Sequence, residues 1–179
     1  EKFRAAVVKY VVPVASSIYR EQAARLGKSY PMNFADNALM FRSGNPKPCG
    51  TPAEILAQGK HFYEELSPET GEFFNTMLDN ELLDVLSTPG KRAGGYCTSL
   101  GDYHVPFIFA NFNGTQHDVE VVTHEAGHAF AAWLNRDRIP QSYIWPSLEA
   151  CEVHSMSMEF FAWPWAEGFF GEDTRKFRY

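Results

Sequence analysis

The residues best suited to chemistry in this sequence lie in the segment 123–129. His124, Glu125 and His128 form the pattern HExxH. On an α-helix, side chains four residues apart project from the same face, so both histidines can bind one metal ion. The glutamate beside the first histidine can then reach a water molecule on that ion. The pattern predicts two metal ligands and, in Glu125, a general base for metal-assisted hydrolysis.

The flanks of this pattern favour a buried helix. A β-branched run of Val119, Val121 and Val122 precedes it, and an apolar run over residues 129–134 follows it. Buried imidazoles need partners, because unpaired polar groups are unfavourable in a core. A metal ion supplies such partners. Two hydrogen-bonded core histidines are the alternative interpretation.

A catalytic zinc site takes three protein ligands and leaves one position open for water. One class of HExxH enzymes has a third His six residues after the second, but that position is Leu134 here. The remaining candidates are the carboxylates of Glu149, Glu152 and Glu159. Residues three or seven apart are helix neighbours, so one carboxylate can bind metal while others accept a ring N–H from a ligating histidine. Spacing alone leaves Glu149 and Glu152 open as the third ligand.

A solvated acidic helix face is the alternative interpretation of these three carboxylates. Apolar neighbours, among them Val153, Met156 and Phe160, argue against it because they predict burial of this helix.

The segments that must position the site predict a mainly helical fold with short strands. Helices are expected over residues 3–26, 51–66, 68–86 with a bend, 118–134 and 147–163, and strands over 96–99 and 105–112. The start at Thr51 is well marked, because Pro52 suits the first helical position and Glu54 completes a capping box.

The strand over residues 105–112 is also a candidate for substrate binding. Pro106 confines this strand to an edge of the sheet or to its first residues. An edge strand can receive an extended peptide through backbone hydrogen bonds. We therefore predict that Phe109, Ala110 and Asn111 bind substrate, with plain strand pairing as the alternative.

Composition excludes several classes of partner. The net charge is −6, the pI is about 5.5, and no Lys/Arg cluster could follow a phosphate backbone, so no nucleic acid is expected. No run has transmembrane length, so no membrane partner is expected either.

Cys49, Cys97 and Cys151 are odd in number and form no CxxC pair, which indicates reduced thiols in the cytoplasm. No repeat or linker is present, which predicts one domain over residues 1–179.

The spacing of the candidate ligands resembles a known family. Glu152 follows His128 by 24 positions, and Ser155 and Glu159 complete the pattern E-x-x-S-x-x-x-E. HExxH followed by this pattern resembles the zinc peptidase family of thimet oligopeptidase and oligoendopeptidase F. The segments 94–97, 111–112 and 163–173 resemble its bacterial oligoendopeptidase branch, so the likeness extends over nearly the whole chain.

The resemblance implies a helical zincin-type catalytic core, with a small β-sheet beside the HExxH helix and a deep channel, that binds one zinc ion per chain. Its site would comprise three ligands, a base and two supporting carboxylates: His124, His128, Glu152, Glu125, Glu159 and Glu149. His154 matches no ligand position of the family and is expected to be an ordinary helix residue.

The implied function is a zinc metalloendopeptidase that hydrolyses short peptides, with Glu125 activating a zinc-bound water. Family members are several times longer, and beyond the equivalent of Tyr179 they carry helices whose His and Tyr contact substrate. The chain is therefore expected to be an internal piece of a longer peptidase, weakly active or inactive by itself.

Two other functions stay open: a non-catalytic zinc- and peptide-binding module, and a zinc carboxypeptidase. The oligomeric state is not readable from the sequence.

Overall fold

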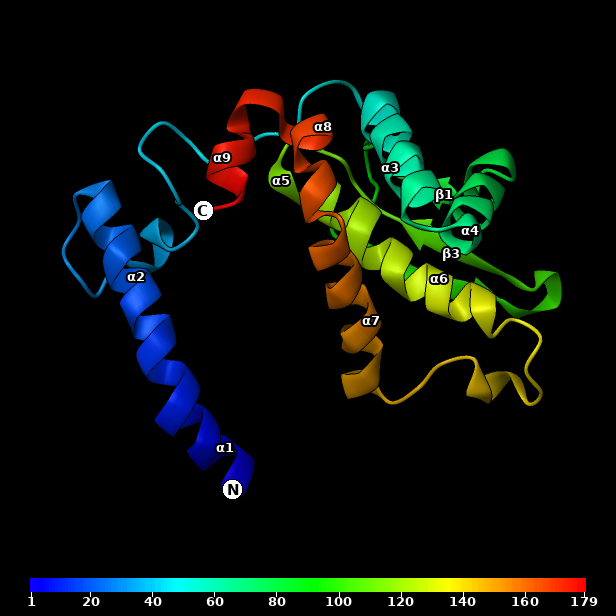
Figure 1. Cartoon of the computed structure of the whole chain (residues 1–179), viewed down its shortest axis with the longest axis horizontal. Helices are drawn as coiled ribbons and strands as arrows, with labels where there is room; N and C mark the ends of the chain where they lie inside the picture. Colours follow the sequence, from blue (N-terminus) through cyan, green and yellow to red (C-terminus); the bar gives the residue numbers. More distant parts are fainter. The chain divides into compact units, whose positions relative to one another are not determined.

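The computed structural model describes residues 1–179, and their contacts divide the chain into two compact units, Glu1–Asn45 and Pro46–Tyr179 (Figure 1). The sequence, in contrast, predicted one domain over residues 1–179. The second unit contains every residue predicted for the site. None of the helices combines the length and the apolar character that crossing a bilayer requires.

The first unit consists of a long helical stretch and an irregular segment with one short 3₁₀ turn. The elements are α1 (Lys2–Ala6), the π-helical η1 (Val7–Val11), α2 (Val12–Leu26) and η2 (Phe34–Asp36). Gly27 ends α2 in the left-handed conformation, with φ 69°, which confirms the predicted stop. The apolar side chains of Val11, Val14 and Ile18 are exposed, so the spacing that predicted this helix does not mark a buried face.

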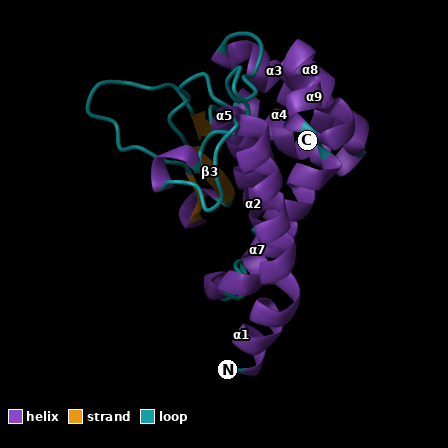
Figure 2. Cartoon of the chain, turned by 90° about the vertical axis from the view of Figure 1, so that its left-hand side faces the viewer, coloured by secondary structure: helices purple, strands orange, loops and turns teal.

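The second unit combines helices with a small sheet, and Figure 2 shows how far helices dominate the chain. Its helices are α3 (Pro52–Leu66), α4 (Pro68–Asp79), α5 (Gln116–Glu120), the π-helical η4 (Val121–Glu125), α6 (Ala126–Leu134), α7 (Leu148–Phe161), α8 (Ala166–Phe170) and α9 (Thr174–Phe177). Its strands are β1 (Leu83–Asp84), β2 (Tyr96–Leu100) and β3 (Val105–Phe109). The remaining elements are the 3₁₀ turns η3 (Gly101–Tyr103), η5 (Gln141–Tyr143), η6 (Trp163–Trp165) and η7 (Gly171–Asp173). A mainly helical fold with a small sheet is thus confirmed.

The first residues of α3 and α4 explain where these helices begin. Thr51 Oγ1 accepts the Glu54 N–H, and the Glu54 carboxylate accepts the Thr51 N–H at 2.6 Å, which confirms the predicted capping box. Ser67 caps α4 by accepting the N–H of Thr70 at 3.2 Å. Each cap satisfies N–H groups that have no partner inside the helix.

The chain after α4 is extended where the sequence predicted a helix. Glu81 adopts a left-handed conformation, with φ 54°. The backbone leaves the helix at this residue and enters β1. The helical continuation predicted up to residue 86 is therefore wrong, because the turn at Glu81 was not visible from apolar spacing.

The sheet has the strand order β1-β3-β2, so β3 is its central strand. It runs parallel to β1 and antiparallel to β2. Pro106 lies opposite Ser99 of β2, and β1 pairs only with Ile108 and Phe109, so the proline stands where β3 has a single neighbour. Of the two alternatives predicted from Pro106, the edge position does not hold for the whole strand, because β1 pairs with the far end of β3, whereas a place among the first residues of the strand is confirmed. β1 and β2 are the two edge strands of the sheet, and each pairs only with β3.

An aromatic core lies behind the helix that carries HExxH. Side chains of α3 and α4 pack there against the apolar residues of η4 and α6: Phe62, Tyr63, Phe73, Phe74 and Met77 against Val121, Val122, Ala126 and Ala129. Tyr63 is fully buried, and its hydroxyl donates a hydrogen bond to the Val122 carbonyl oxygen at 2.9 Å. This bond ties α3 to the turn that precedes His124.

The substitution Tyr63→Phe tests this link. It removes one buried hydrogen bond and keeps the ring, so we expect the free energy of unfolding to fall by about 1 kcal/mol. Chemical denaturation measures the change. Tyr103→Phe, at a tyrosine that is 78% exposed, is the matched control and should leave stability unchanged. Equal effects of the two substitutions would contradict the proposed role of the bond.

Candidate metal centre

The HExxH pattern lies on one continuous helical stretch made of α5, η4 and α6. Its middle part, η4, is a π-helical turn that includes His124 and Glu125. Such turns are rare and occur often at functional sites. The sequence predicted helix here but gave no sign of the π turn. The rings of His124 and His128 lie near each other, with centroids 4.9 Å apart.

The start of this stretch is held by a residue that the sequence did not indicate. The carboxylate of Asp118 is buried and accepts the backbone N–H groups of Asn113 at 2.9 Å and of Gly114 at 2.7 Å. It thereby fixes the turn that leads into the helix. The sequence does contain a sign of this turn: an Asn-Gly pair, which favours a turn, is followed four residues later by an aspartate that can accept the free N–H groups of the pair.

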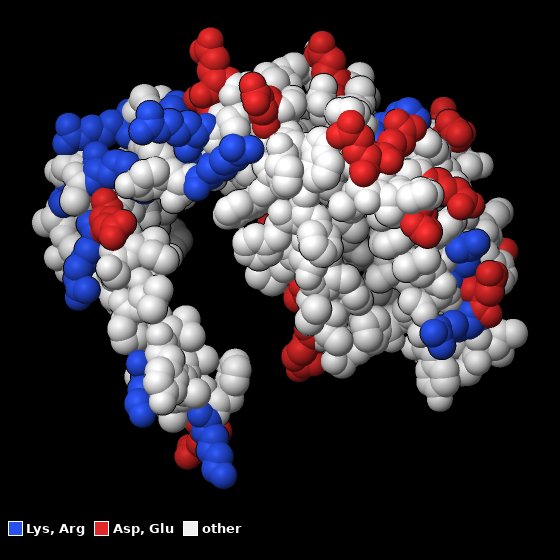
Figure 3. Space-filling view, in the orientation of Figure 1, with Lys and Arg blue, Asp and Glu red and all other residues white.

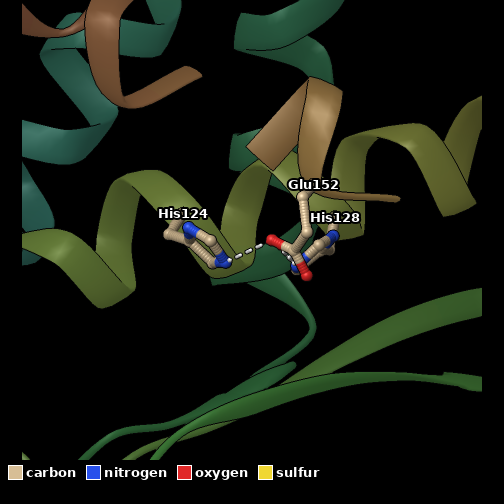
Figure 4. A group of neighbouring side chains, drawn as sticks. All are labelled: His124, His128 and Glu152. Atoms are coloured by element: carbon tan, nitrogen blue, oxygen red, sulfur yellow. Dashed lines mark ion pairs between the residues drawn. The ribbon is translucent and has the colours of Figure 1, made fainter. Parts of the chain in front are cut away.

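Three side chains from two helices converge, as Figure 4 shows. His124 and His128 project from the HExxH helix, and Glu152 projects from α7 toward them. Glu152 Oε2 lies 3.3 Å from His124 Nε2 and 3.8 Å from His128 Nε2. One ligand atom of each residue lies within 4.8 Å of the others. The structure therefore brings Glu152, rather than Glu149, to the two histidines.

The donor set fits zinc. Two imidazole nitrogens and one carboxylate oxygen are a common set for catalytic zinc. Burial, with a smaller contribution from the neighbouring His124, lowers the pKa of His128. A lowered pKa favours the neutral imidazole, which is the form that binds metal. Ser155 Oγ donates to Glu152 Oε2 at 3.0 Å and so restrains the carboxylate.

Glu159 supports His124 from the side away from Glu152. His124 Nδ1 donates to Glu159 Oε1 at 2.6 Å, which leaves Nε2 free to face Glu152. Such a partner fixes the tautomer and the orientation of a ligating ring. Glu149 lies exposed in the first turn of α7 and has no hydrogen bond or ion pair with either histidine. Of the two carboxylates predicted to support the ligands, only Glu159 forms a hydrogen bond with a candidate ligand, His124.

The face of α7 around these carboxylates is more open than predicted. Val153, Met156 and Phe160 are exposed, whereas Ser155 and Met158 are buried. The burial predicted from the apolar neighbours is therefore wrong for most of this helix. Its buried strip is narrow and faces α6.

Glu125 lies beside the metal-binding group and against β2. Burial, together with the nearby Glu152 carboxylate, raises the pKa of Glu125. His124 and a hydrogen bond from the Cys97 backbone N–H act in the opposite direction. Burial also raises the pKa of the Cys97 thiol.

A cleft adjoins these residues. A cavity of about 210 Å³ is lined by His117, Glu120, Val121, His124, Glu125 and Glu159. His117 and Glu120 were not predicted, although they precede His124 by seven and four positions and so share its helix face. A second cavity of about 200 Å³ lies beyond Glu159 and Glu120 and has mainly apolar walls, including Phe160, Trp163 and Phe170.

The three residues predicted to bind substrate, Phe109, Ala110 and Asn111, make their contacts within the sheet and the loop beside it. The Phe109 ring stacks on Tyr96, with centroids 5.1 Å apart. Ala110 is fully buried, and its N–H donates to the Asp84 carbonyl at 2.8 Å. The Asn111 amide donates to the Arg92 carbonyl. The structure thus favours plain strand pairing for these residues, and the edge position on which their substrate role depended is absent.

A model of the family described as Peptidase family M3 matches residues 60–174, which include the whole metal-binding group. The chain belongs to peptidase family M3. This family membership agrees with the resemblance inferred from the spacing of the ligands.

The individual proteins that this chain resembles are oligopeptidases and oligoendopeptidases. A crystal structure from Bacillus anthracis str. Ames, assigned as an oligoendopeptidase F, is 50% identical over 99% of this chain and 32% of its own, with a TM-score of 0.93. Oligoendopeptidase F of Lactococcus lactis subsp. cremoris is 31% identical over 63% of this chain and 17% of its own. Oligopeptidase PepF of Bacillus subtilis (strain 168) is 30% identical over 52% of this chain and 14% of its own. The chain therefore spans a third or less of each relative.

The role of Glu159 can be tested by Glu159→Ala. Loss of the acceptor for His124 Nδ1 should weaken zinc binding by about 10-fold or more. Competition with a chelator of known affinity measures the change. Glu149→Ala is the matched control from the same helix and should leave zinc affinity unchanged. A larger effect of Glu149→Ala would show that the wrong carboxylate has been identified.

Gly127 sets the distance between the ligand-bearing helices. A Cβ at this position would lie 2.7 Å from Ser155 Cα and 3.0 Å from the His154 carbonyl oxygen. We expect Gly127→Ala to push α7 away from α6 and to weaken zinc binding together with stability, because backbone atoms cannot yield as a side chain can.

Gly168→Ala is the control for this substitution. A Cβ there would meet only the end of the flexible Gln58 side chain. Thermal unfolding and zinc affinity should both stay close to those of the unsubstituted protein. Unchanged zinc affinity in Gly127→Ala would contradict the spacing argument.

Proposed function

We propose that this protein is a zinc endopeptidase that hydrolyses peptide bonds in short peptides. The observation that carries the proposal is the convergence of His124, His128 and Glu152 beside the Glu125 carboxylate. Membership of peptidase family M3 and the names of the relatives, which are oligopeptidases and oligoendopeptidases, support it. Because the chain spans a third or less of these relatives, activity is a property to be measured on the whole protein.

His124, His128 and Glu152 would hold the zinc ion, through Nε2, Nε2 and Oε2 respectively. Bound zinc supplies Lewis-acid polarisation to the peptide carbonyl and to the attacking water. The protein must keep the three donors in place, which is the task of Glu159 behind His124 and of Ser155 beside Glu152.

Glu125 performs the proton transfers. Its carboxylate accepts a proton from the water that attacks the carbonyl carbon, so that a C–O bond forms. It then delivers this proton to the amide nitrogen as the C–N bond breaks, which releases a free amine. Partial burial suits this role, because it raises the proton affinity of a carboxylate.

The edge of β2 is the place where a peptide backbone can be held. This edge is unpaired on the side away from β3, and the Cys97 N–H on β2 is directed at Glu125. An extended peptide that adds to β2 would pass the base and the metal ligands. The substrate role first predicted for β3 is thus transferred to β2.

Partners and location follow from the same features. On the face that Figure 3 shows, acidic side chains are spread over the second unit and basic side chains gather on the first, so this face of the unit that carries the site offers no broad basic surface to a nucleic acid. The three cysteines are free, as expected in a reducing cytoplasm. We therefore propose peptides as the substrates and the cytoplasm as the location.

The substitution Glu125→Gln tests the catalytic assignment. The amide cannot accept the proton, so we expect hydrolysis of a quenched fluorescent peptide to fall by at least about 100-fold. Zinc content by elemental analysis should stay unchanged. Chelation of the metal in the unsubstituted protein should abolish hydrolysis, and added zinc should restore it. A non-catalytic binding module would show no turnover in either protein.

Mass spectrometry of the products distinguishes endopeptidase from carboxypeptidase action. Peptides blocked at both ends should be cleaved at internal bonds. Release of only the last residue, and only from peptides with a free carboxyl end, would refute the endopeptidase assignment.

A further inference from the structure

Two nitrogen atoms beside the metal-binding group are buried without a hydrogen-bond partner: His128 Nδ1 and His154 Nε2. The mechanism above uses only the opposite nitrogen of His128, and it gives His154 no role. Buried polar atoms are almost always paired, and each exception requires an explanation. Here two exceptions occur on neighbouring rings.

The two rings belong to the two helices that build the site. Their centroids are 6.2 Å apart, and their planes meet at 86°. A direct hydrogen bond between the nitrogens requires about 3 Å, which two rings at this separation do not reach. One bridging water, with two hydrogen bonds of about 2.9 Å, spans a gap of this size. A water buried between polar groups in this way is a normal part of protein structure.

The other ligand shows what His128 lacks. His124 has a carboxylate partner for its second nitrogen, at 2.6 Å. Histidines that bind metal almost always donate their second ring N–H to such a partner. No carboxylate takes this place at His128, and its Nδ1 has no hydrogen-bond partner. Because the atom is buried, its partner must be a group in its immediate surroundings or a water enclosed there.

We infer that His154 is the positioning residue of His128. One bridging water accepts a hydrogen bond from His128 Nδ1–H and donates a hydrogen bond to the lone pair of His154 Nε2. This holds Nε2 of His128 unprotonated and directed at Glu152. His154 then carries its own proton on Nδ1 and touches neither metal nor substrate. The inference rests on the proposed zinc site and adds His154 to Glu159 and Ser155 as residues that restrain its ligands.

The first test compares zinc affinities of the whole protein by competition with a chromophoric chelator. His154→Leu keeps an apolar volume but cannot accept a hydrogen bond, whereas the amide oxygen of His154→Gln can. We expect His154→Leu to weaken zinc binding by about 10- to 100-fold and His154→Gln to remain within a few-fold of the unsubstituted protein.

The control is His61→Ala, which removes an imidazole from α3 that is 57% exposed. It should leave zinc affinity unchanged. A merely structural His154 would give the reverse order, with leucine tolerated and glutamine harmful. Equal zinc affinity of His154→Leu and the unsubstituted protein would overturn the inference.

The second test needs no variant of His154 to fold. Nitrogen-15 NMR of the metal-free protein, labelled on histidine, reports which ring nitrogen of His128 is protonated. We expect Nδ1, and a proton on Nε2 would overturn the inference. Absence of zinc binding in the unsubstituted protein would refute the proposed function instead, and the tautomer of metal-free His128 would still decide the role of His154.

Discussion

The second unit depends on one constraint: a carboxylate on α7 must be held against two imidazoles on another helix. Glu152 Oε2 lies within 4 Å of both His124 and His128. Two imidazole nitrogens and a carboxylate oxygen that converge in this way form a donor set that suits a shared cation. The approach of the two helices is possible because the motif has a glycine at its fourth position, where any side chain would meet the α7 backbone.

The rest of the second unit serves to keep that approach fixed. Aromatic side chains of α3 and α4 fill the space behind the HExxH helix, and the Tyr63 hydroxyl bonds to the turn before the first ligand. In front, β2 places a backbone N–H against Glu125. The base therefore lies between a rigid core and a strand edge that remains open to a peptide. Rigid support on one side and access on the other are what a hydrolytic site requires.

Much of the site could be predicted from the sequence because its signals are local. The i, i+4 spacing of the histidines, the cap residues Thr51 and Ser67, and the spacing of Glu152 and Glu159 are all properties of single helices. Glu81 and Pro106 are two positions at which local patterns did not predict the structure. A left-handed residue after α4 turned an expected helix into β1, and β1 then paired with the far end of a strand for which Pro106 had left an edge position open. Strand order is a tertiary property, so the sequence assigned the substrate strand to β3, which is the central strand, whereas β2 is an edge strand.

The π turn at η4 and the nearness of the His154 and His128 rings could not be read from local patterns either. The second feature depends on how α6 and α7 pack, because a buried nitrogen is recognised only when its surroundings are known. The exposure of Val153 and Met156 is the converse case, since an apolar residue near a ligand does not imply that its helix is buried on all sides. Burial predictions along α7 failed for this reason, whereas two of the carboxylates predicted for the site, Glu152 and Glu159, lie beside the histidines of the HExxH motif.

X-ray absorption at the zinc edge of the whole protein, after exhaustive dialysis, tests the central claim most directly. The account predicts one zinc per chain, with imidazole nitrogen and carboxylate oxygen in the first coordination sphere and no sulfur. Absence of bound zinc, or a sulfur ligand from one of the three cysteines, would contradict it.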